Sequence, residues 1–459
     1  MATHHDTIVI GAGITGLVAS YKLCKQGQKV ALLEASDRVG GVIRSEQKQG
    51  FLVEYGPNSF LESGETTELI TELGLNEELV SANPKAPRYI YFRDRLEAVP
   101  MSPPALIATR LLSVKGKLRL LSEPFVAPRR FNDEEESLAS FVCRRFGQEV
   151  HDRLFSPFVS GVYAGNTELL SASACFPKLT DLEKEHGSLF FGMVKTIFAK
   201  REAKKAKSSS RLSSFRSGMQ TLPHRLAEKI GNSLLLSAKI EKINISQQSP
   251  KYSVEFVRDG QRYSFTSDNL IVATPTKIVV ELLGDQLPEL SKELETIEYT
   301  RLAVIHLSFK VSDIARSLNG FGFLIPRGQS VRTLGTIWNS SLFPNRAPEG
   351  EVLFTSFIGG AHDLGAVELR DEELVAIVSG ELKKILSTSA DAKLISLWKW
   401  QKAIPQYCIG HVAKLKRIEA AVKGQKGLYL AGNYLQGVSV PDCVSRAIKI
   451  AEDINKTTC

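Results

Sequence analysis

The feature that most constrains this sequence is a glycine turn close to its start. Gly11-Ala12-Gly13-Ile14-Thr15-Gly16 follows the apolar run 7–10 and opens a stretch with the apolar spacing of a helix. A second apolar run, 30–33, then ends at Glu34. Strand, glycine turn, helix, strand and acid in this order form the βαβ fingerprint of a dinucleotide-binding fold.

Each residue type in the turn has a physical reason to be there. Gly11 permits the tight turn after the strand, Gly13 lets the backbone approach a pyrophosphate, and Gly16 lets the helix pack closely on the strand. The N–H groups of Ile14 and Thr15 lie at the expected helix N-terminus, where free donors and a partial positive charge favour phosphate. We therefore predict that these five residues bind a dinucleotide.

A second motif begins at the acid, whose carboxylate suits a ribose diol. It reads Glu34-Ala35-Ser36-Asp37-Arg38-Val39-Gly40-Gly41-Val42-Ile43-Arg44-Ser45. This stretch resembles the second fingerprint of the FAD-dependent amine oxidase superfamily, which is an acid, then Arg-x-Gly-Gly, then Arg and Ser or Thr. The resemblance implies that the cofactor is FAD and that it is contacted by Glu34, Ala35, Arg38, Gly40, Gly41 and Arg44.

The residue types of this second motif agree with the resemblance. Gly40-Gly41 lets the backbone run beside a bulky cofactor, and Arg38 and Arg44 can meet phosphate charge. The alternative for the two arginines is an ordinary solvated surface position.

Bulk composition is that of a globular protein long enough for two or three domains. The 459 residues are 43% hydrophobic and 24% charged. A net charge of +8 favours nucleic acid, an anionic membrane surface or an acidic substrate. Because no zinc-finger, recognition-helix or RNA-binding signature accompanies this charge, we expect no nucleic-acid partner.

Cysteine usage and hydropathy bear on the compartment. The six cysteines are dispersed and form no CxxC pair, which is typical of a reduced intracellular chain without a structural metal. The first strand begins too early for a signal peptide, and no run approaches the ~18 apolar residues of a spanning helix. We expect a cytoplasmic protein that is either free or peripheral on the inner face of the cell membrane.

Further stretches resemble the protoporphyrinogen oxidase family within this superfamily, and the resemblance covers nearly the whole chain. They include Glu54-Tyr55-Gly56-Pro57-Asn58-Ser59-Phe60, the segment 155–165, and the segment 400–411. The resemblance implies hydride transfer from a porphyrinogen to flavin N5, with dioxygen reoxidising the flavin and peroxide released. No residue is identified as a catalytic base.

The resemblance assigns five residues to the porphyrinogen. Arg88 would face a propionate, Gly161 would line the macrocycle cavity, Leu324 and Ile337 would sandwich one pyrrole ring, and Phe357 would stack on another. An apolar clamp with a guanidinium at its rim suits a hydrophobic macrocycle that carries carboxylates. Without the resemblance, a surface arginine, a helix-end glycine and buried strand residues remain the alternatives.

The resemblance also extends the FAD site along the chain. It assigns to the cofactor Gly56, Pro57, Asn58, the backbone of Ile240, Ala273, Trp400, Gly432, Asn433, Val438, Ser439 and Val440. The last five belong to a strand–helix motif whose N–H groups would face the flavin. Pro441-Asp442 departs from the family pattern, which leaves the flavin contacts at this turn open.

Two residues near position 410, Cys408 and His411, are of types that can attach FAD covalently or act in catalysis, and we expect neither role here. The residues around Cys408 do not match those of amine oxidases that tether FAD through a cysteine, so we expect non-covalent FAD. His411 is expected to contact a helix start and not to act in catalysis.

Together the motifs predict an α/β fold with a Rossmann-like FAD domain of the amine-oxidase (GR2) type, a mixed-sheet substrate domain and an inserted helical domain. The FAD domain is expected at 1–83, 225–275 and 420–459, the substrate domain at 84–100, 208–224 and 276–419, and the helical domain at 101–207. Asp259-Gly260 predicts a hairpin turn.

The expected helical domain contains a basic and apolar-rich stretch, 101–131. Such helices either lie on an anionic membrane surface or pack their leucines inward. The resembled family is typically monotopic, with membrane-contacting helices in this part of the chain, and both readings stay open. The charge run 199–216 is expected to be solvated and mobile.

The resulting hypothesis is FAD-dependent oxidation of protoporphyrinogen IX to protoporphyrin IX in heme biosynthesis. One alternative is the oxidation of coproporphyrinogen III, whose four carboxylates would need more cations around the pocket. Another is a flavin amine oxidase, against which Arg88 argues, and a third is a flavin-bearing or membrane-surface protein without turnover. A homodimer and product handover to a chelatase are further expected partners.

Overall fold

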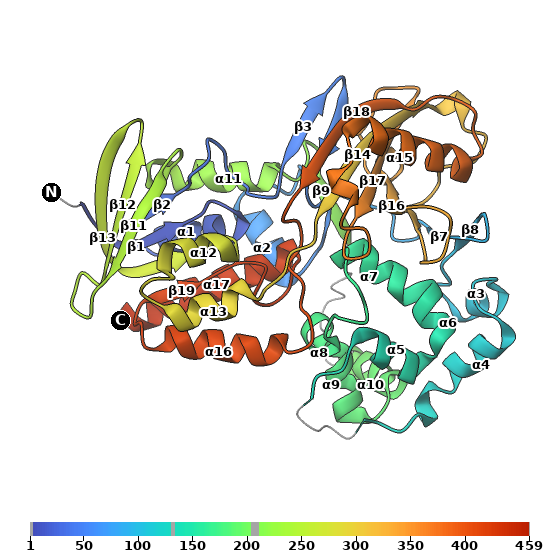
Figure 1. Cartoon of the computed structure of the whole chain (residues 1–459), viewed down its shortest axis with the longest axis horizontal. Coiled ribbons are helices and arrows are strands. Elements are labelled where there is room, and N and C mark those ends of the chain that lie inside the picture. The colour runs from blue at the N-terminus through green and yellow to red at the C-terminus, as the bar shows by residue number, and fades with distance from the viewer. Residues whose placement is uncertain (1–2, 130–133, 203–210, 459) are drawn as a thin grey trace.

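The structure is a computed structural model that describes residues 3–129, 134–202 and 211–458. Residues 203–210 of the charge run 199–216 therefore lie outside the described residues, as does Arg130. The described chain forms two large sheets and a group of helices (Figure 1). The first sheet lies on the left of that view together with both termini, and the second sheet and the helices lie on the right.

The first sheet is parallel at its centre and is built from segments far apart in the sequence. Its order is β10-β2-β1-β13-β12-β11, with β19 also paired to β13. The strands are β1 (Thr3–Ile10), β2 (Val30–Leu33), β10 (Leu234–Leu235), β11 (Lys239–Ile245), β12 (Tyr252–Arg258), β13 (Gln261–Val272) and β19 (Leu428–Leu430). This is the discontinuous Rossmann-like sheet that the fold class required.

The predicted βαβ unit opens this sheet. Strand β1 pairs in parallel with β2, from Thr7 opposite Val30 to Ile10 opposite Leu33, and α1 (Ile14–Lys25) connects them. Both strands are buried on both faces where they pair, which explains their continuous apolar runs.

The predicted hairpin is confirmed between β12 and β13. Arg258 pairs with Gln261, so the loop is the two residues Asp259 and Gly260. Both have positive φ, 51° and 75°, as a primed two-residue turn requires.

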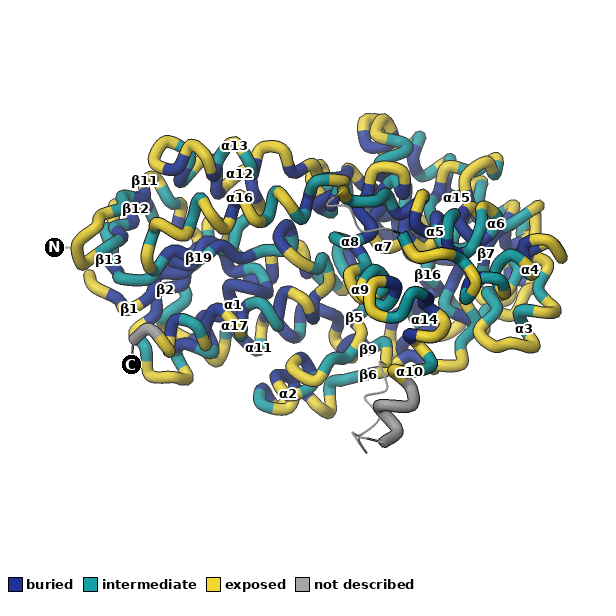
Figure 2. The backbone as a smooth tube through the Cα atoms, turned by 90° about the horizontal axis from the view of Figure 1, so that it is seen from below, coloured by how far each residue is buried: buried dark blue, intermediate teal, exposed yellow. Residues whose placement is uncertain are grey.

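Helices cover both faces of the first sheet. One face packs against α1, α2 (Gly64–Glu72), α11 (Thr221–Ile230) and α17 (Val440–Thr458). The other face packs against α12 (Thr276–Leu283), α13 (Pro288–Glu295) and α16 (His411–Lys423). Figure 2 shows that the chain is buried along β19 and along much of α1.

The helices on the second face of the first sheet bear on the expected domain ranges. Helices α12, α13 and part of α16 lie inside 276–419, the range that the sequence assigns to the substrate domain, yet their side chains pack into the cluster on the first sheet. The apolar faces of these helices indicate burial but not the sheet they meet, so the sequence could not show this. The remaining domain boundaries stay a prediction.

The second sheet is mixed, with the order β18-β14-β17-β16-β15-β7-β8. Its strands are β7 (Arg88–Phe92), β8 (Arg95–Ala98), β14 (Leu302–Lys310), β15 (Gly322–Leu324), β16 (Thr333–Trp338), β17 (Glu351–Gly359) and β18 (Lys393–Trp400). Helix α15 (Asp371–Leu386) covers one face and shares a hydrophobic cluster with it. The opposite face is therefore the one available to a substrate.

The helices between residues 103 and 202 form the lower right of Figure 1. They are α3 (Pro103–Ala108), α4 (Val114–Leu121), α5 (Leu138–Phe146), α6 (Gln148–Val150), α7 (Ser156–Tyr163), α8 (Ala172–Cys175), α9 (Pro177–His186) and α10 (Leu189–Glu202), with a 3₁₀ turn η1 (Glu123–Phe125) and a π turn η2 (His151–Phe155). At their centre the fully buried Arg145 pairs with Glu123 and with Glu183. This paired charge joins α5, η1 and α9.

Short elements join the large parts. They are the hairpin β3 (Ser45–Lys48) and β4 (Phe51–Glu54), the small sheet of β5 (Phe60–Leu61), β9 (Leu212–Phe215) and β6 (Leu79–Ser81), the helix α14 (Asn339–Leu342), and the 3₁₀ turns η3 (Gly231–Ser233), η4 (Val311–Asp313) and η5 (Ala366–Glu368). Within the described ranges, no helix is both long and apolar enough to cross a membrane.

Candidate active site

The glycine turn is closed by main-chain contacts that exclude a side chain. Gly11 has φ +99°, and a Cβ there would lie 2.7 Å from the carbonyl oxygen of Ala273. A Cβ on Gly16 would overlap the carbonyl oxygen of Gly11. Glycine at these two positions therefore holds together the end of β1, the start of α1 and the segment after β13.

Gly13 differs from its neighbours because the space in front of it is open. A Cβ built on Gly13 would meet nothing within 4 Å, although Gly13 is the N-cap residue of α1. The backbone donors at the start of this helix thus face free space. This is the arrangement in which a helix N-terminus binds phosphate.

The second glycine pair lies directly beside this turn. Gly40 forms an isolated parallel bridge with Gly13, and its N–H donates to the carbonyl of Ala12 over 2.8 Å. A Cβ on Gly41 would lie 3.4 Å from the Cα of Gly13. Two motifs that the sequence separates by more than twenty residues therefore form one cradle.

Glu34 is anchored at the end of β2. Its Oε2 accepts from the N–H of Ala12 over 2.7 Å, and its Oε1 accepts from the N–H and the hydroxyl of Ser36. Ala35, the next residue, is exposed. The carboxylate is thus oriented at the cradle, where a ribose diol would meet it.

The two arginines of the second motif are used differently. Arg38 donates to the carbonyl oxygens of Val39 and Gly41, over 3.3 and 2.7 Å, and so braces the glycine loop. Arg44 lies over the ring of Tyr55 at 4.9 Å and the ring of Trp398 at 4.8 Å. Direct phosphate contact stays a prediction for both.

The loop after β4 approaches the same place. A Cβ on Gly56 would overlap the carbonyl of Val42, so this loop lies against the second motif. Pro57 follows, and the amide of Asn58 donates to the carbonyl of Gly56 over 3.2 Å. Trp400, at the end of β18, donates its indole N–H to the carbonyl of Tyr55 over 2.7 Å.

The segment after β13 completes the wall behind Gly11. Ala273 donates its N–H to the carbonyl of Ile10 over 2.8 Å. The hydroxyl of the next residue, Thr274, is buried without a hydrogen-bond partner among the described residues. Ile240 lies on β11, where the pairing with β12 shifts by one residue before Lys242. These placements leave the predicted cofactor roles of Ala273 and Ile240 untested.

The C-terminal motif lies at the start of α17. Gly432 has φ +153°, the carbonyl of Asn433 accepts from the hydroxyl of Tyr407, and Val438 packs beside the helical cluster. Ser439 donates its N–H and its hydroxyl to Asp442 over 3.2 and 2.5 Å, directly before Val440 opens the helix. The N–H of Asp442 donates in turn to the Ser439 hydroxyl over 3.3 Å, so the two residues form a capping box at this helix start. Asp442, which departs from the family pattern, is therefore part of the helix cap.

The predicted substrate residues of the second sheet share one face. Leu324 pairs with Gly335, which pairs with Phe357, while Gly322 pairs with both Arg88 and Ile337. Paired residues and residues two apart point to the same side of a sheet. Arg88, Leu324, Ile337 and Phe357 therefore lie together, opposite the cluster that α15 covers.

The fifth predicted residue reaches this face from α7. A Cβ on Gly161 would lie 2.6 Å from Cδ2 of Leu324. Phe158 and Val162 are exposed on the same side of the helix, one turn apart. Phe158 was not predicted, although its spacing of three from Gly161 on a helix was the signal available.

A buried hydrogen-bond chain connects the cofactor side to this face. Asn339 donates to Oδ1 of Asn58 over 2.7 Å and accepts from the hydroxyl of Thr355 over 2.7 Å. Thr355 pairs with Ile337 across the sheet. The loop assigned to FAD and the face assigned to the substrate are thus linked through Asn339 and Thr355.

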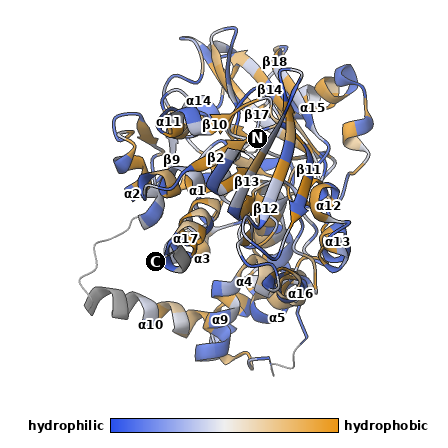
Figure 3. Cartoon of the chain, turned by 90° about the vertical axis from the view of Figure 1, so that its left-hand side faces the viewer, coloured by the Kyte–Doolittle hydropathy of each residue, from blue (hydrophilic) through white to orange (hydrophobic). Residues whose placement is uncertain are grey.

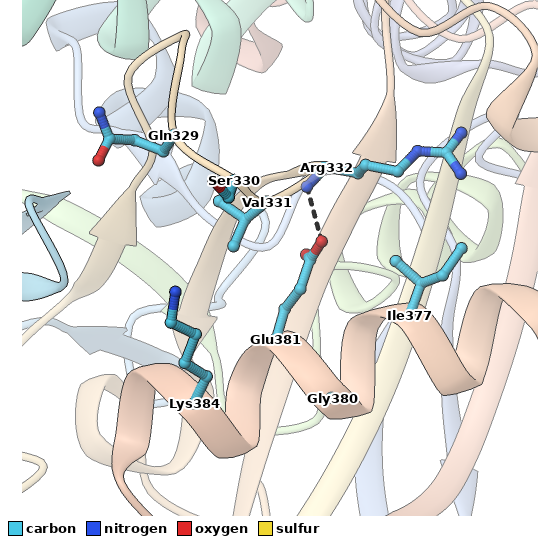
Figure 4. Close-up of a pocket in the computed structure, with 8 residues that line it drawn as sticks. All are labelled: Gln329, Ser330, Val331, Arg332, Ile377, Gly380, Glu381 and Lys384. Carbon is cyan, nitrogen blue, oxygen red and sulfur yellow. Dashed lines mark hydrogen bonds between the residues drawn. The ribbon is translucent and has the colours of Figure 1, made fainter.

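A surface hollow elsewhere on the second sheet contains none of the predicted residues. It lies between the loop before β16 and α15, and Gln329, Ser330, Val331, Arg332, Ile377, Gly380, Glu381 and Lys384 line it (Figure 4). Glu381 is already engaged there by the N–H groups of Arg332 and Thr333. The hollow is on the α15 side and is not part of the site described above.

Glu54, which the sequence reasoning did not single out, is a buried carboxyl beside the cradle. It is 1% exposed, and it accepts from the hydroxyl of Ser45 over 2.6 Å and from the N–H of Met219 over 2.8 Å. Burial raises the pKa of Glu54 to about 7, although these bonds and the charge of Arg346 oppose the shift. The available signal was an acid at the end of the apolar strand 51–54.

The groups around Glu54 tie it to the cofactor loop. Gln220 donates from its N–H to the Ser45 hydroxyl over 2.9 Å and from its amide to the carbonyl of Val39 over 3.0 Å. His306 donates to the carbonyl of Glu54, and burial lowers the pKa of this histidine to about 4, so it is neutral. The carboxyl of Glu54 therefore holds the second motif against the turn at 218–220.

Comparison with known proteins identifies the family. The family described as flavin containing amine oxidoreductase matches residues 14–455. The chain belongs to this family. It is 34% identical to protoporphyrinogen oxidase 1, chloroplastic, of Arabidopsis thaliana, over 98% of the chain and 88% of that protein. It is 31% identical to coproporphyrinogen III oxidase of Bacillus subtilis, over 97% of each.

Solved structures agree on the fold. A protein from Exiguobacterium sp. 255-15 superimposes with a TM-score of 0.81 at 26% identity, covering 99% of both chains. A putrescine oxidase bound to putrescine superimposes with a TM-score of 0.72 at 16% identity, which supports the fold alone.

Membership in the family settles the cofactor and the reaction class. The protein is an oxidoreductase, and its cofactor is FAD. The family contains flavin, and the glycine turn with Glu34 forms a cradle that suits a dinucleotide. The residues present fit that group: free space at Gly13, an oriented Glu34 and the unpartnered hydroxyl of Thr274. The resemblance to the protoporphyrinogen oxidase family is also confirmed.

Gly13→Val tests the cradle. Because a Cβ at Gly13 meets no protein atom within 4 Å, we expect the variant to fold and to lose FAD affinity by at least ~100-fold, the equivalent of one or two charge-assisted hydrogen bonds. FAD titration of the apoprotein measures the affinity and thermal unfolding of the apoprotein measures the fold. Gly64→Ala, which also meets no atom, is the matched control. Unchanged FAD affinity in Gly13→Val would remove the cradle from the site.

Glu54→Gln tests the buried carboxyl. Its folded pKa of about 7 exceeds the unfolded value, so the stability it contributes is present at low pH and is lost as pH rises to 7. From pH 5 to pH 8 the wild type should therefore lose about 3 kcal/mol relative to Glu54→Gln. Urea unfolding of both holoproteins at the two pH values measures this difference, and parallel pH curves would contradict it.

Proposed function

We propose that this protein oxidises a porphyrinogen to a porphyrin, with protoporphyrinogen IX as substrate and dioxygen as the final electron acceptor. The observation that carries the proposal is the apolar face of Leu324, Ile337 and Phe357, with the cation of Arg88 at its edge. The loop assigned to FAD is linked to this face through Asn339 and Thr355. Relatives with porphyrinogen oxidase names cover almost the whole chain, which supports the same substrate class.

The division of labour follows from the residue types. FAD, when bound, accepts hydride from the reduced macrocycle and passes the electrons to dioxygen. The protein's own residues orient the substrate: Leu324, Ile337 and Phe357 are half-buried and offer flat apolar contact, and Arg88 offers a planar fork for a propionate. The guanidinium of Arg88 lies 5.5 Å from the ring centre of Phe321 and is exposed, so it can reach a carboxylate.

Two alternatives are weighed by charge. A flavin amine oxidase needs a site for a cationic substrate, whereas the charged group predicted to meet substrate here is Arg88. Coproporphyrinogen III oxidation is the closer alternative because relatives from Bacillus subtilis and Staphylococcus aureus carry that name, at 31% and 28% identity. It requires more than one cation around the face.

The test is turnover by the purified holoprotein. We expect a yellow protein that converts protoporphyrinogen IX to a fluorescent porphyrin while it consumes dioxygen and releases peroxide. Porphyrin fluorescence and an oxygen electrode measure the two sides of the reaction. An FAD-loaded protein that leaves the rate equal to that of spontaneous oxidation would reject the proposal.

Gly161→Ala tests the proposed substrate face in the same turnover assay. The new methyl group would push into Leu324, so we expect kcat/KM for the porphyrinogen to fall about tenfold with FAD still bound. Gly380→Ala is the matched control, because this exposed glycine also lies inside a helix and its Cβ would meet nothing. Both alanines favour a helix, so neither should lower the melting temperature much.

Peripheral membrane contact is the proposed location. Exposed apolar side chains lie on α3, α4, η1 and α10. Of these helices, α4 and α10 lie in the lower half of Figure 3. The most exposed are Phe125 at 88%, Ile107 at 76%, Val114 at 74% and Leu118 at 64%. Lys115 is exposed beside them. An apolar patch with basic residues at its rim favours an anionic bilayer surface.

Leu118→Asp with Phe125→Asp tests this location. Each removes a side chain that would enter the bilayer and adds repulsion from anionic lipid, so the double variant should lose co-sedimentation with vesicles rich in phosphatidylglycerol. The control is Leu364→Asp, which changes an exposed leucine of the second-sheet region. Equal sedimentation of all three proteins would contradict membrane contact. A homodimer and handover to a chelatase stay predictions.

A further inference from the structure

An arginine outside the predicted set stands at the end of the substrate face opposite to Arg88. Strands β7 and β15 run parallel, with Arg88 level with Gly322. The chain then advances from Gly322 through Leu324 to Arg327. Arg88 therefore lies level with the first residue of β15, and Arg327 follows the last residue of β15 by three positions.

Arg327 is held near the loop that follows α7. Its Nη2 contacts Nδ1 of His362, in the loop that follows β17. The N–H of Ala361, the preceding residue, donates to the carbonyl of Ala164 over 2.7 Å, directly after α7. Since α7 also brings Gly161 against Leu324, the pair of Arg327 and His362 lies near one end of this face, beside the C-terminus of α7.

The partner of Arg327 supplies a hydrogen bond but no negative charge. Burial and the neighbouring Arg327 lower the pKa of His362 to about 4, so the ring is neutral and Nδ1 accepts. Glu168 acts on Arg327 from the loop after α7. Across the described ranges, no carboxylate lies within ion-pair distance of Arg327, and burial lowers its pKa.

Nearby arginines are paired, which sets Arg327 apart. Arg153 pairs with Glu149 over 3.1 Å, Arg301 with Glu368 over 2.8 Å, and Arg332 with Asp363 over 2.9 Å. Each of these guanidinium groups already has its carboxylate. Arg327 is instead oriented by a neutral acceptor that leaves the rest of its fork available.

We propose that Arg327, oriented by His362, forms a second carboxylate-binding subsite, so that the site takes porphyrinogens with carboxylates on opposite edges of the macrocycle. The inference rests on the proposed function. Protoporphyrinogen IX carries its two propionates on neighbouring rings, at one edge that Arg88 serves. Coproporphyrinogen III carries a propionate on every pyrrole ring, so one of its carboxylates reaches Arg327 when another meets Arg88.

The subsite makes Arg327 a specificity-determining residue for substrate choice. Arg327 is exposed in the free protein. A hydrogen-bonded pair between its guanidinium and a carboxylate, shielded from water by the bound macrocycle, corresponds to a factor of about 10 to 100 in affinity. That gain in affinity applies to coproporphyrinogen III, which has four carboxylates, and not to protoporphyrinogen IX, which has two. Arg88, by contrast, should serve both substrates.

Arg327→Gln tests this with both porphyrinogens on the FAD-loaded protein. We expect kcat/KM for coproporphyrinogen III to fall at least tenfold more than kcat/KM for protoporphyrinogen IX, mainly through KM. Fluorescence titration with coproporphyrin III should show a matching loss of affinity. Arg327→Lys, which keeps the charge without the fork, should show a smaller loss, and it guards against a folding defect in the glutamine variant.

The controls separate this inference from the proposed function. Arg262→Gln changes an exposed arginine at the far end of the first sheet and should leave both rates unchanged. Arg88→Gln should lower both rates together. If the wild type oxidises neither porphyrinogen, the proposed function fails. If it oxidises protoporphyrinogen IX but rejects coproporphyrinogen III, or if Arg327→Gln leaves the ratio of the two rates unchanged, the second subsite alone is overturned.

Discussion

The main-chain contact at Gly11 is the constraint on which the rest of the molecule depends. Gly11 touches the carbonyl of Ala273 and lies under Gly16, so three segments meet there with no side chain between them. This contact sets how closely α1 approaches β1 and β13, and hence where the helix N-terminus points. Gly11 and Gly16 pack against main chain, whereas Gly13, between them in the same turn, faces open space where phosphate can bind.

The joint between the cofactor loops and the second sheet has a buried polar part beside the apolar cluster of Phe51, Val53, Tyr55, Leu353 and Ile395. Burying polar groups there costs desolvation that an apolar joint would avoid. Asn58, Asn339 and Thr355 satisfy one another there, and Glu54 is satisfied by Ser45 and Met219. A satisfied polar network has directional requirements that an apolar one lacks. It therefore fixes the register between the cofactor loop and the substrate face, whereas apolar packing alone would tolerate a small slide.

The parts of this structure that depend on local chemistry could be predicted from the sequence. The glycine turn, the acid at Glu34 and the Asp259-Gly260 hairpin follow from backbone requirements that only a few residue types meet. The placement of α12, α13 and α16 on the first sheet did not follow, because an amphipathic helix does not encode which sheet it covers. Arg327 and His362 were also missed: each is ordinary in its own segment, and only the parallel course of β15 and β17 brings them together.

The scattered origin of the first sheet has a consequence for how the protein is made. Strand β19 and the turn at Gly432 come from residues after 427, yet β19 pairs with β13 next to β1. On the ribosome, the cradle of residues 11–41 is synthesised long before the strand that completes its sheet. Contacts with such large sequence separation form late and slowly. FAD is therefore expected to join a nearly finished chain, and until then the edge of β13 needs protection from other strands.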